Sequence, residues 1–155
     1  MFLSRIFNSL NSSIEELAVV QILELNEKTK EYGLILTPDE VRQMMNTRNQ
    51  VLNNYGRVEL SIEVTKEIIE LFSASPYINE DDYLFTLNEL HEIFYYIKNE
   101  TEEKIGDCRM IEMMRKLFDG DCGGSLNLLK SKLEEYAEVF RSEIQLYEAL
   151  EGDDD

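Results

Sequence analysis

Residues that interrupt regular structure are scarce in this sequence. Its 155 residues include 2 prolines and 7 glycines. The charged residues are mostly Glu and Lys, which helices tolerate far better than strands do. A chain of this length with 43% hydrophobic residues can bury one well-formed core and is too short for two ordinary domains. We therefore predict one all-α domain, a bundle of about six or seven helices over residues 1–150.

Basic residues are also few: 15 Lys and Arg stand against 32 Asp and Glu, which gives a formal net charge of −17. At low salt such a surface repels phosphate backbones and anionic lipid head groups. We therefore predict no nucleic-acid partner and no membrane partner. A basic protein or a divalent cation could use the charge, although a merely solvated acidic surface explains it as well. The last five residues, Glu151 to Asp155, are predicted to form an acidic tail.

Cysteine and histidine, which often carry chemistry, are nearly absent. Cys108 and Cys122 match neither a C-x-x-C motif nor a secreted disulfide framework, so we expect reduced thiols in a cytoplasmic protein. The first ten residues lack the apolar core of a signal peptide, and no segment has the apolar length of a membrane span. His91 is the one histidine and lacks the second His of the zinc motif H-E-x-x-H. No phosphate-binding or dinucleotide-binding motif occurs, and no cofactor is predicted.

The longest segment that reads as one helix runs from Asn79 to Ile105, without Gly or Pro inside it. Asn79 is its predicted N-cap. Residues 100° apart form one broad apolar face, made of Tyr83, Leu84, Leu87, Leu90, His91, Phe94, Ile97 and Ile105. Phe85 and Tyr96 fall on the opposite side. We therefore predict a central helix with neighbours on more than one face, and Phe85 and Tyr96 as candidate contacts for a protein partner.

Apolar residues in the first ten positions repeat at helical spacing and are followed by the polar run Asn11-Ser12-Ser13. We expect a short amphipathic helix there, and a second helix from Ser12 or Ser13 to about Tyr32. A helix that lies on a membrane surface usually carries several Lys or Arg, whereas this segment has Arg5 alone. Docking onto the core or onto a second subunit is therefore the preferred interpretation.

The clearest helix start is Thr37-Pro38-Asp39-Glu40, where Thr37 is the N-cap and Glu40 its partner in a capping box. The helix that begins there carries Arg48 on its apolar stripe. Three explanations stay open for Arg48: its stem lies along the core while its head reaches solvent, it pairs with a carboxylate in a partly buried site, or it faces a ligand. If the head is buried, we expect a carboxylate within hydrogen-bonding distance.

Three further helices are expected along the chain. In order, they contain Val64 to Phe72, Met110 to Phe118, and Leu126 to about Leu150. The break Ser75-Pro76 and the glycine-rich loop 120–124 mark two of their ends.

That glycine-rich loop is similar to the calcium loop of an EF-hand. Counting from Asp119 as position 1 places side-chain oxygens at Asp121 and Asn127 and the required glycine at Gly124. Position 5 is a glycine, and position 12 is Lys130, where Ca²⁺ needs a bidentate Glu. Asp119, Asp121 and Asn127 are therefore candidate metal ligands, and we expect the loop to bind Ca²⁺ weakly or not at all.

Four short segments carry a resemblance to a known family. They are Gly56-Arg57-Val58-Glu59, Ser75-Pro76-Tyr77-Ile78, Glu92-Ile93-Phe94-Tyr95-Tyr96-Ile97-Lys98-Asn99-Glu100 and Cys122-Gly123-Gly124-Ser125. Together they resemble a family of small, acidic, cytoplasmic bacterial proteins that is a domain of unknown function. The resemblance covers about residues 20 to 145. It implies no activity, cofactor or catalytic residue.

These observations favour a non-enzymatic, acidic helical module that binds a protein partner or associates with itself, as an adaptor does. A calcium-binding protein built on the Asp119 loop is the first alternative. The second is an enzyme, for which Arg48, His91 and nearby carboxylates would have to meet in one cleft.

Overall fold

A computed structural model describes the backbone of residues 2–152 and the side chains in that range other than those of residues 2, 4, 7–12, 147, 148, 151 and 152. Six helices of ten residues or more dominate this part of the chain, and no strand occurs in it. They are α1 (Phe2–Glu24), α3 (Pro38–Asn54), α4 (Glu63–Phe72), α5 (Tyr83–Glu100), α6 (Asp107–Asp119) and α7 (Leu126–Gly152). A short helix, α2 (Asn26–Thr29), and the 3₁₀ turn η1 (Lys30–Tyr32) follow α1. The predicted all-α bundle is confirmed.

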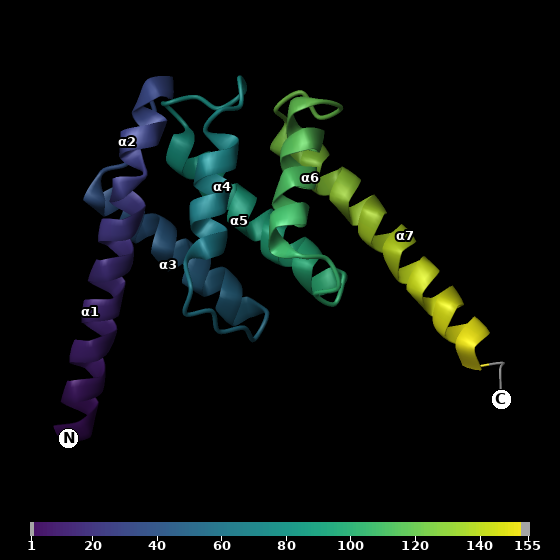
Figure 1. The fold of residues 1–155 in the computed structure, drawn as a ribbon, viewed down its shortest axis with the longest axis horizontal. Coiled ribbons are helices and arrows are strands. Elements are labelled where there is room, and N and C mark those ends of the chain that lie inside the picture. Colours follow the sequence, from purple (N-terminus) through teal and green to yellow (C-terminus); the bar gives the residue numbers. More distant parts are fainter. Residues whose placement is uncertain (1, 153–155) are drawn as a thin grey trace.

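Helix α5 lies at the centre of the bundle and packs against α3, α4, α6 and α7 (Figure 1). Its buried side chains come from more than one face, as predicted, and are Tyr83, Thr86, Leu87, Leu90, His91, Ile93, Phe94, Tyr95 and Ile97. A helix buried on several sides is the expected centre of a bundle, because each neighbour covers one of its faces.

The ends of α5 differ from the predicted ones. Residues 79–82 are not helical, so Asn79 is not the N-cap, and Ile105 lies in the loop after the helix. The helix ends at Glu100, where the Thr101 hydroxyl donates to the Ile97 carbonyl (2.8 Å). The Ile97 carbonyl also accepts from the Thr101 amide (3.0 Å), so this second bond gives the buried Thr101 hydroxyl a partner on the last turn of the helix.

The predicted break at Asn11-Ser12-Ser13 is wrong, because α1 runs through it as one helix. Asn and Ser lower helix propensity by less than about 1 kcal/mol each, which neighbouring helix formers can offset. The helix instead ends at Glu24, well before Tyr32. Just beyond that end, the Asn26 side chain donates to the Leu36 carbonyl (2.9 Å) and accepts from the Leu36 amide (3.0 Å), which holds the returning connector against the helix end.

Helix α3 begins at the predicted capping box. The Thr37 hydroxyl accepts from the Glu40 amide (3.1 Å), and the Glu40 carboxylate accepts from the Thr37 amide (3.0 Å). The box fixes the direction in which α3 leaves the connector, and α3 then carries Arg48 into the core.

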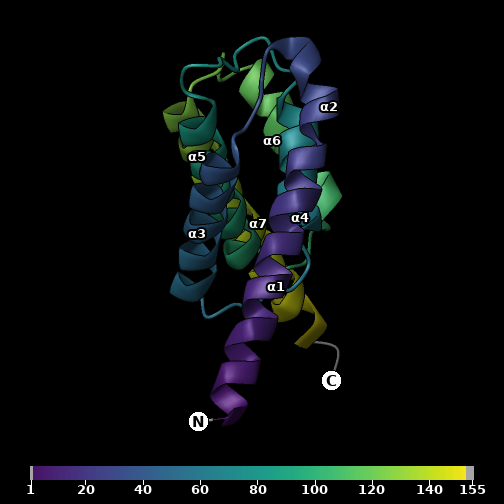
Figure 2. The same ribbon diagram turned by 90° about the vertical axis from the view of Figure 1, so that its left-hand side faces the viewer.

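The two terminal helices extend past the body of the bundle. Figure 2 shows the N-terminal part of α1 beyond the other helices, and Figure 1 shows α7 leaving the body on the other side. Among the described side chains, the first that is buried in α1 is Ala18, and the last in α7 is Ala137. The predicted acidic tail begins within α7 and continues into residues 153–155, which lie outside the described residues. No helix in the described part of the chain is long and apolar enough to cross a membrane.

Candidate functional site

Arg48 lies in the core, with 4% of its surface exposed. Its guanidinium donates through Nη2 to the carbonyls of Glu59 (3.0 Å) and Ser61 (2.8 Å), and through Nη1 to the side-chain oxygen of Asn49 (3.0 Å). The expected carboxylate within hydrogen-bonding distance is therefore wrong. Backbone carbonyls take its place. The connection between α3 and α4 is neither helix nor strand, so its carbonyls need hydrogen-bond donors from elsewhere in the protein. Arg48 thus fastens this connection to α3.

The Glu59 carboxylate joins the same connection to α5. It accepts from the Tyr95 hydroxyl at Oε2 (2.6 Å) and from the Lys98 ammonium at Oε1 (3.1 Å). Lys98 also pairs with Asp107 at the start of α6 (3.1 Å). We refer to Arg48, Glu59, Tyr95, Lys98 and Asp107 as the Glu59 network. The network connects α3 to the Glu59 carbonyl, α5 to the Glu59 carboxylate, and α6 to α5 through Asp107.

The surroundings of Glu59, Tyr95 and Lys98 keep these three side chains in their ordinary charge states at neutral pH. Burial favours a raised pKa for Glu59, but the hydrogen bonds from Tyr95 and Lys98 and the charges of Lys98 and Arg48 outweigh it and lower the pKa. Burial and the Glu59 carboxylate raise the pKa of Tyr95. Burial opposes the charge of Lys98, but its bonds to Asp107 and Glu59 raise its pKa. The network is therefore a charge-balanced support in which two cations face two carboxylates.

His91 is fully buried, and both of its ring nitrogens have partners. Nδ1 lies 2.7 Å from the Leu87 carbonyl, and Nε2 lies 2.9 Å from the Thr65 hydroxyl. Because a carbonyl can only accept, the proton sits on Nδ1, and Nε2 accepts from Thr65. Burial lowers the pKa of His91 to about 4, although the bond to Leu87 opposes the shift. The imidazole is neutral at pH 7 and has no nitrogen free for a substrate.

Arg48 and His91 share the interior of the bundle, and neither lines the pocket beside Tyr96, the pocket between α4 and α6 or the pocket between α6 and α7. Catalysis needs functional groups that a substrate can reach. Their closed positions give the enzyme alternative no support.

Phe85 and Tyr96 lie in different surroundings. Phe85 is 60% exposed near the start of α5. Tyr96 is half-buried and lines a pocket of about 170 Å³ between α3, α5 and α7, together with Tyr55, Glu89 and Glu92 among others. Burial and the Glu92 charge raise the pKa of Glu89. Eleven positions on one helix separate Phe85 from Tyr96 by about 16 Å along its axis, so the two rings do not touch, but one protein partner of ordinary interface size can contact both.

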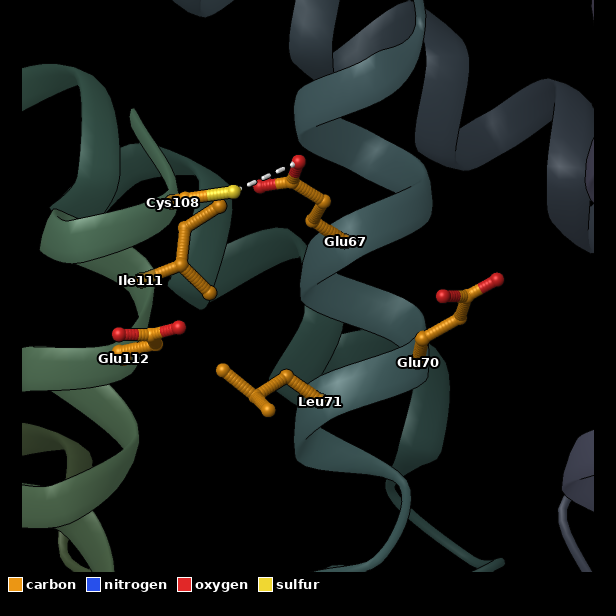
Figure 3. Close-up of a pocket in the computed structure, with 6 residues that line it drawn as sticks. All are labelled: Glu67, Glu70, Leu71, Cys108, Ile111 and Glu112. Carbon is orange, nitrogen blue, oxygen red and sulfur yellow. Dashed lines mark hydrogen bonds between the residues drawn. The ribbon is translucent and has the colours of Figure 1, made fainter. Parts of the chain in front are cut away.

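A second pocket, of about 230 Å³, lies between α4 and α6 (Figure 3). The Cys108 thiol donates to the Glu67 carboxylate (3.1 Å), Leu71 and Ile111 point into the space between the helices, and Glu70 points away from it. The hydrogen bond to Glu67 raises the pKa of Cys108. A protonated thiol is a poor nucleophile, so this pocket does not present an activated cysteine. Sequence reasoning missed the pocket, because its walls come from helices that are far apart in the chain.

The first candidate metal ligand, Asp119, already has partners. It is the last residue of α6, and its carboxylate accepts from the Ser75 hydroxyl (2.6 Å) and from Arg115 Nε (2.5 Å). Asp121 and Asn127 are exposed. Among the residues that the structure describes, no group of three or more His, Cys, Asp or Glu side chains is placed to hold a metal ion. The weak affinity expected for Ca²⁺ stays a prediction, and the bonds of Asp119 add a reason for it.

The EF-hand-like loop makes a packing contact. Gly124 has φ of +82°, and a Cβ added to it would lie 2.5 Å from the side chain of Tyr77. A residue with a side chain would therefore be strained and would also displace Tyr77. The Tyr77 ring in turn packs edge-on against Phe118, with 6.2 Å between ring centroids. The glycine thus allows the segment before α5 to lie against the end of α6.

The four segments that carry the family resemblance meet in pairs. Residues 75–78 contact the 122–125 segment through Tyr77, and residues 56–59 contact the 92–100 segment through Glu59. Both contacts lie near the ends of helices. The segments that carry the family resemblance therefore meet at the junctions between helices. The fold and these junctions define a small all-α bundle organised around one buried helix.

The chain belongs to a family of unknown function, DUF6323, which matches residues 21–146. No curated protein and no solved structure matches it. The predicted membership of a family without a known function is confirmed, whereas the bacterial origin and the cytoplasmic location stay predictions.

Proposed function

We propose that the protein is a non-enzymatic interaction module that associates with a second copy of itself through the N-terminal half of α1. The observation that carries this proposal is the exposure of that half-helix. All described side chains from Leu3 to Leu17 are exposed, and Leu3, Ile6, Ile14 and Leu17 are apolar. The sequence favours docking of this segment either onto the core or onto a second subunit. Because these side chains do not pack against the core, we infer that they pack against a second subunit.

The spacing of apolar residues in α1 suits pairing with another helix. Positions 3, 7, 10, 14 and 17 are Leu or Ile or Phe and follow alternating steps of four and three, the spacing of a coiled-coil seam. Arg5 is the one charged residue before Glu15. Two copies can therefore approach along this segment with little of the repulsion that a net charge of −17 creates elsewhere.

The magnitudes are sufficient for a dimer. Fully burying one Leu or Ile side chain contributes about 1.5–3 kcal/mol, so the exposed Leu3, Ile14 and Leu17 of the two copies would together contribute about 9–18 kcal/mol. Association costs about 4–15 kcal/mol in lost freedom. An isolated helix of this length is only marginally stable in water, so covering the stripe would also stabilise α1 itself.

Phe85 and Tyr96 are proposed contacts for a further protein partner. Phe85 offers an exposed ring near the start of α5, and Tyr96 offers the rim of its pocket. Exposed aromatic rings are enriched at protein interfaces, since they supply large contact area at a small entropic cost.

Sedimentation velocity over a concentration series tests the α1 dimer. We expect the native protein to sediment as a dimer and the double variant Ile14→Asp/Leu17→Asp as a monomer with an unchanged bundle. The matched control is Val58→Asp/Leu60→Asp, which replaces two exposed side chains of the α3–α4 connection and adds the same charge. It should remain a dimer. A native protein that stays monomeric at the highest concentration, or a control that dissociates equally, would contradict the proposal.

A further inference from the structure

A third pocket, which we name the basic cleft, lies between α6 and the middle of α7. Its volume is about 590 Å³, and its lining includes Lys104, Arg109, Met113, Lys116, Tyr136 and Phe140. We propose that the basic cleft binds a small amphiphilic anion, meaning a carboxylate or phosphate carried on a flat apolar body. This binding site is separate from the exposed half of α1 and does not depend on the dimer.

The cationic side of the cleft is unusual for so acidic a chain. Three of the 15 basic residues gather around it. Within the described part of the chain, no salt bridge joins Arg109 or Lys116 to a carboxylate. Lys104 pairs with exposed Glu102 at 3.6 Å, a contact that water weakens. The Arg109 and Lys116 side chains can therefore donate charge-assisted hydrogen bonds to an anion.

One acidic side chain, Glu112, also lines the cleft. The three cations outnumber it, so the local charge is positive. The negative charges elsewhere on the molecule are screened beyond about 8 Å at physiological ionic strength. Groups in direct contact with a bound anion therefore dominate its affinity, in spite of the overall charge of −17.

The apolar side of the cleft comes from α7. Tyr136 and Phe140 are one helical turn apart, and their rings are stacked with 6.2 Å between centroids and 24° between planes. They form a flat wall that suits an aromatic or extended alkyl body. Met113 contributes an adaptable surface from α6. The volume lies within the range of about 300–1,000 Å³ that is usual for small-molecule sites.

The arrangement separates the two chemical requirements of an amphiphilic anion. Arg109 and Lys116 come from α6, and the stacked rings come from α7. The two helices diverge from the loop that joins them (Figure 1), so the cleft lies between walls of different character. A flat ligand with its charge at one edge can bind the cations of α6 and the rings of α7 at the same time. An inorganic anion can bind only the cations, and a neutral hydrocarbon can contact only the rings.

Fluorescence titration with two related probes tests the proposal. The anionic probe is 1-anilinonaphthalene-8-sulfonate, and the uncharged control is N-phenyl-1-naphthylamine, which has the same ring system. We expect saturable binding of the anion. The variant Arg109→Gln/Lys116→Gln should weaken the anion about tenfold and leave the uncharged probe unchanged. The matched variant Lys28→Gln/Arg42→Gln removes two exposed cations from α2 and α3 and should change neither.

A third variant gives the opposite sign. Glu112→Gln removes the acidic group from the cleft and should strengthen the anion about threefold. Damage to the fold would not tighten the binding of the anionic probe while leaving the uncharged probe unchanged. A gain for the anionic probe only therefore identifies the local charge as the cause. Thermal melts of each variant show that the bundle is intact. Absence of saturable binding, equal affinity for both probes, or an equal loss in the two double variants would overturn the proposal.

Discussion

At the residue scale, the buried polar side chains carry the largest energetic consequences. In the folded protein, the hydrogen bonds that Arg48 would make to water are replaced by bonds to backbone carbonyls. Those of His91 are replaced by bonds to the Leu87 carbonyl and the Thr65 hydroxyl. A polar group that loses its partners inside a protein costs more free energy than the bond itself contributed. Substitutions at these two positions should therefore show what the interior of the bundle requires.

Arg48→Met keeps an apolar stem and removes the guanidinium. The carbonyls of Glu59 and Ser61 then lose their donor, so the free energy of unfolding should fall by about 3 kcal/mol. The control is Arg42→Met on the exposed face of the same helix, where loss of exposed ion pairs should cost within about 1 kcal/mol. Urea unfolding at pH 7 measures both. Equal losses would show that the buried head of Arg48 is dispensable.

His91 should make stability depend on pH. Its pKa is about 4 in the folded protein, against 6.5 for an unperturbed histidine. Between these values the unfolded chain binds a proton that the folded chain does not, so the free energy of unfolding falls as the pH drops from about 6.5 to 4. The full loss is about 3 kcal/mol. Chemical denaturation of the native protein and of His91→Gln at several pH values isolates this effect, because the carboxylates cancel in the difference. Parallel profiles would mean that His91 titrates normally.

At the scale of elements, helix starts that rest on side-chain bonds are predictable, and elements shaped by distant contacts are not. The Thr37 capping box sits within four residues, and the structure has it as expected. Asn79 has the chemistry of an N-cap as well, but α5 begins only at Tyr83, after a segment whose Tyr77 packs against Gly124.

The same limit applies to the candidate site. Arg48 and His91 stand out in the sequence as polar residues on apolar stripes, so their unusual positions are predictable. Their partners are not, because Glu59 meets Tyr95 and Lys98 across 36 and 39 residues with no local signal. The pockets beside Tyr96 and Cys108 are likewise formed by helices that are distant in the chain, whereas the basic cleft lies between the consecutive helices α6 and α7.

The Thr37 capping box should contribute measurably to α3. Thr37→Ala removes the hydroxyl that accepts from the Glu40 amide and should cost about 1 kcal/mol. Thr37→Ser keeps the oxygen and should cost far less. Thermal or urea melts distinguish them, and two variants of equal stability would mean that the hydroxyl is not needed.

The Gly124 contact should be more sensitive than its neighbour. Gly123 and Gly124 both have positive φ, but a Cβ on Gly123 meets nothing within 4 Å, whereas one on Gly124 meets Tyr77 at 2.5 Å. Gly124→Ala should therefore destabilise the protein by about 2 kcal/mol more than Gly123→Ala, as overpacking does. Because both variants place alanine at a positive φ, the difference between their free energies of unfolding cancels the backbone strain that they share. Similar losses in urea unfolding would show that Tyr77 moves aside freely.

At the scale of the whole molecule, the acidic surface should govern the response to salt. With a net charge of −17, like charges repel one another in the folded state, and added salt screens them. We expect the melting temperature to rise with NaCl. We also expect MgCl₂ and CaCl₂, compared with each other at equal ionic strength, to raise the melting temperature by the same amount. A larger shift with Ca²⁺ that Lys130→Glu enlarges further would instead support a calcium site at the Asp119 loop.

The position of the single histidine also makes the protein its own spectroscopic reporter. One imidazole means one set of ring signals in a proton NMR spectrum, without overlap from others. In the closed core these signals should not shift between about pH 5 and 8, whereas in the open chain they titrate near pH 6.5. Two resolved sets of peaks would then give the open fraction directly. Opening of the interior could be followed in this way without a label, during titration with any ligand or partner.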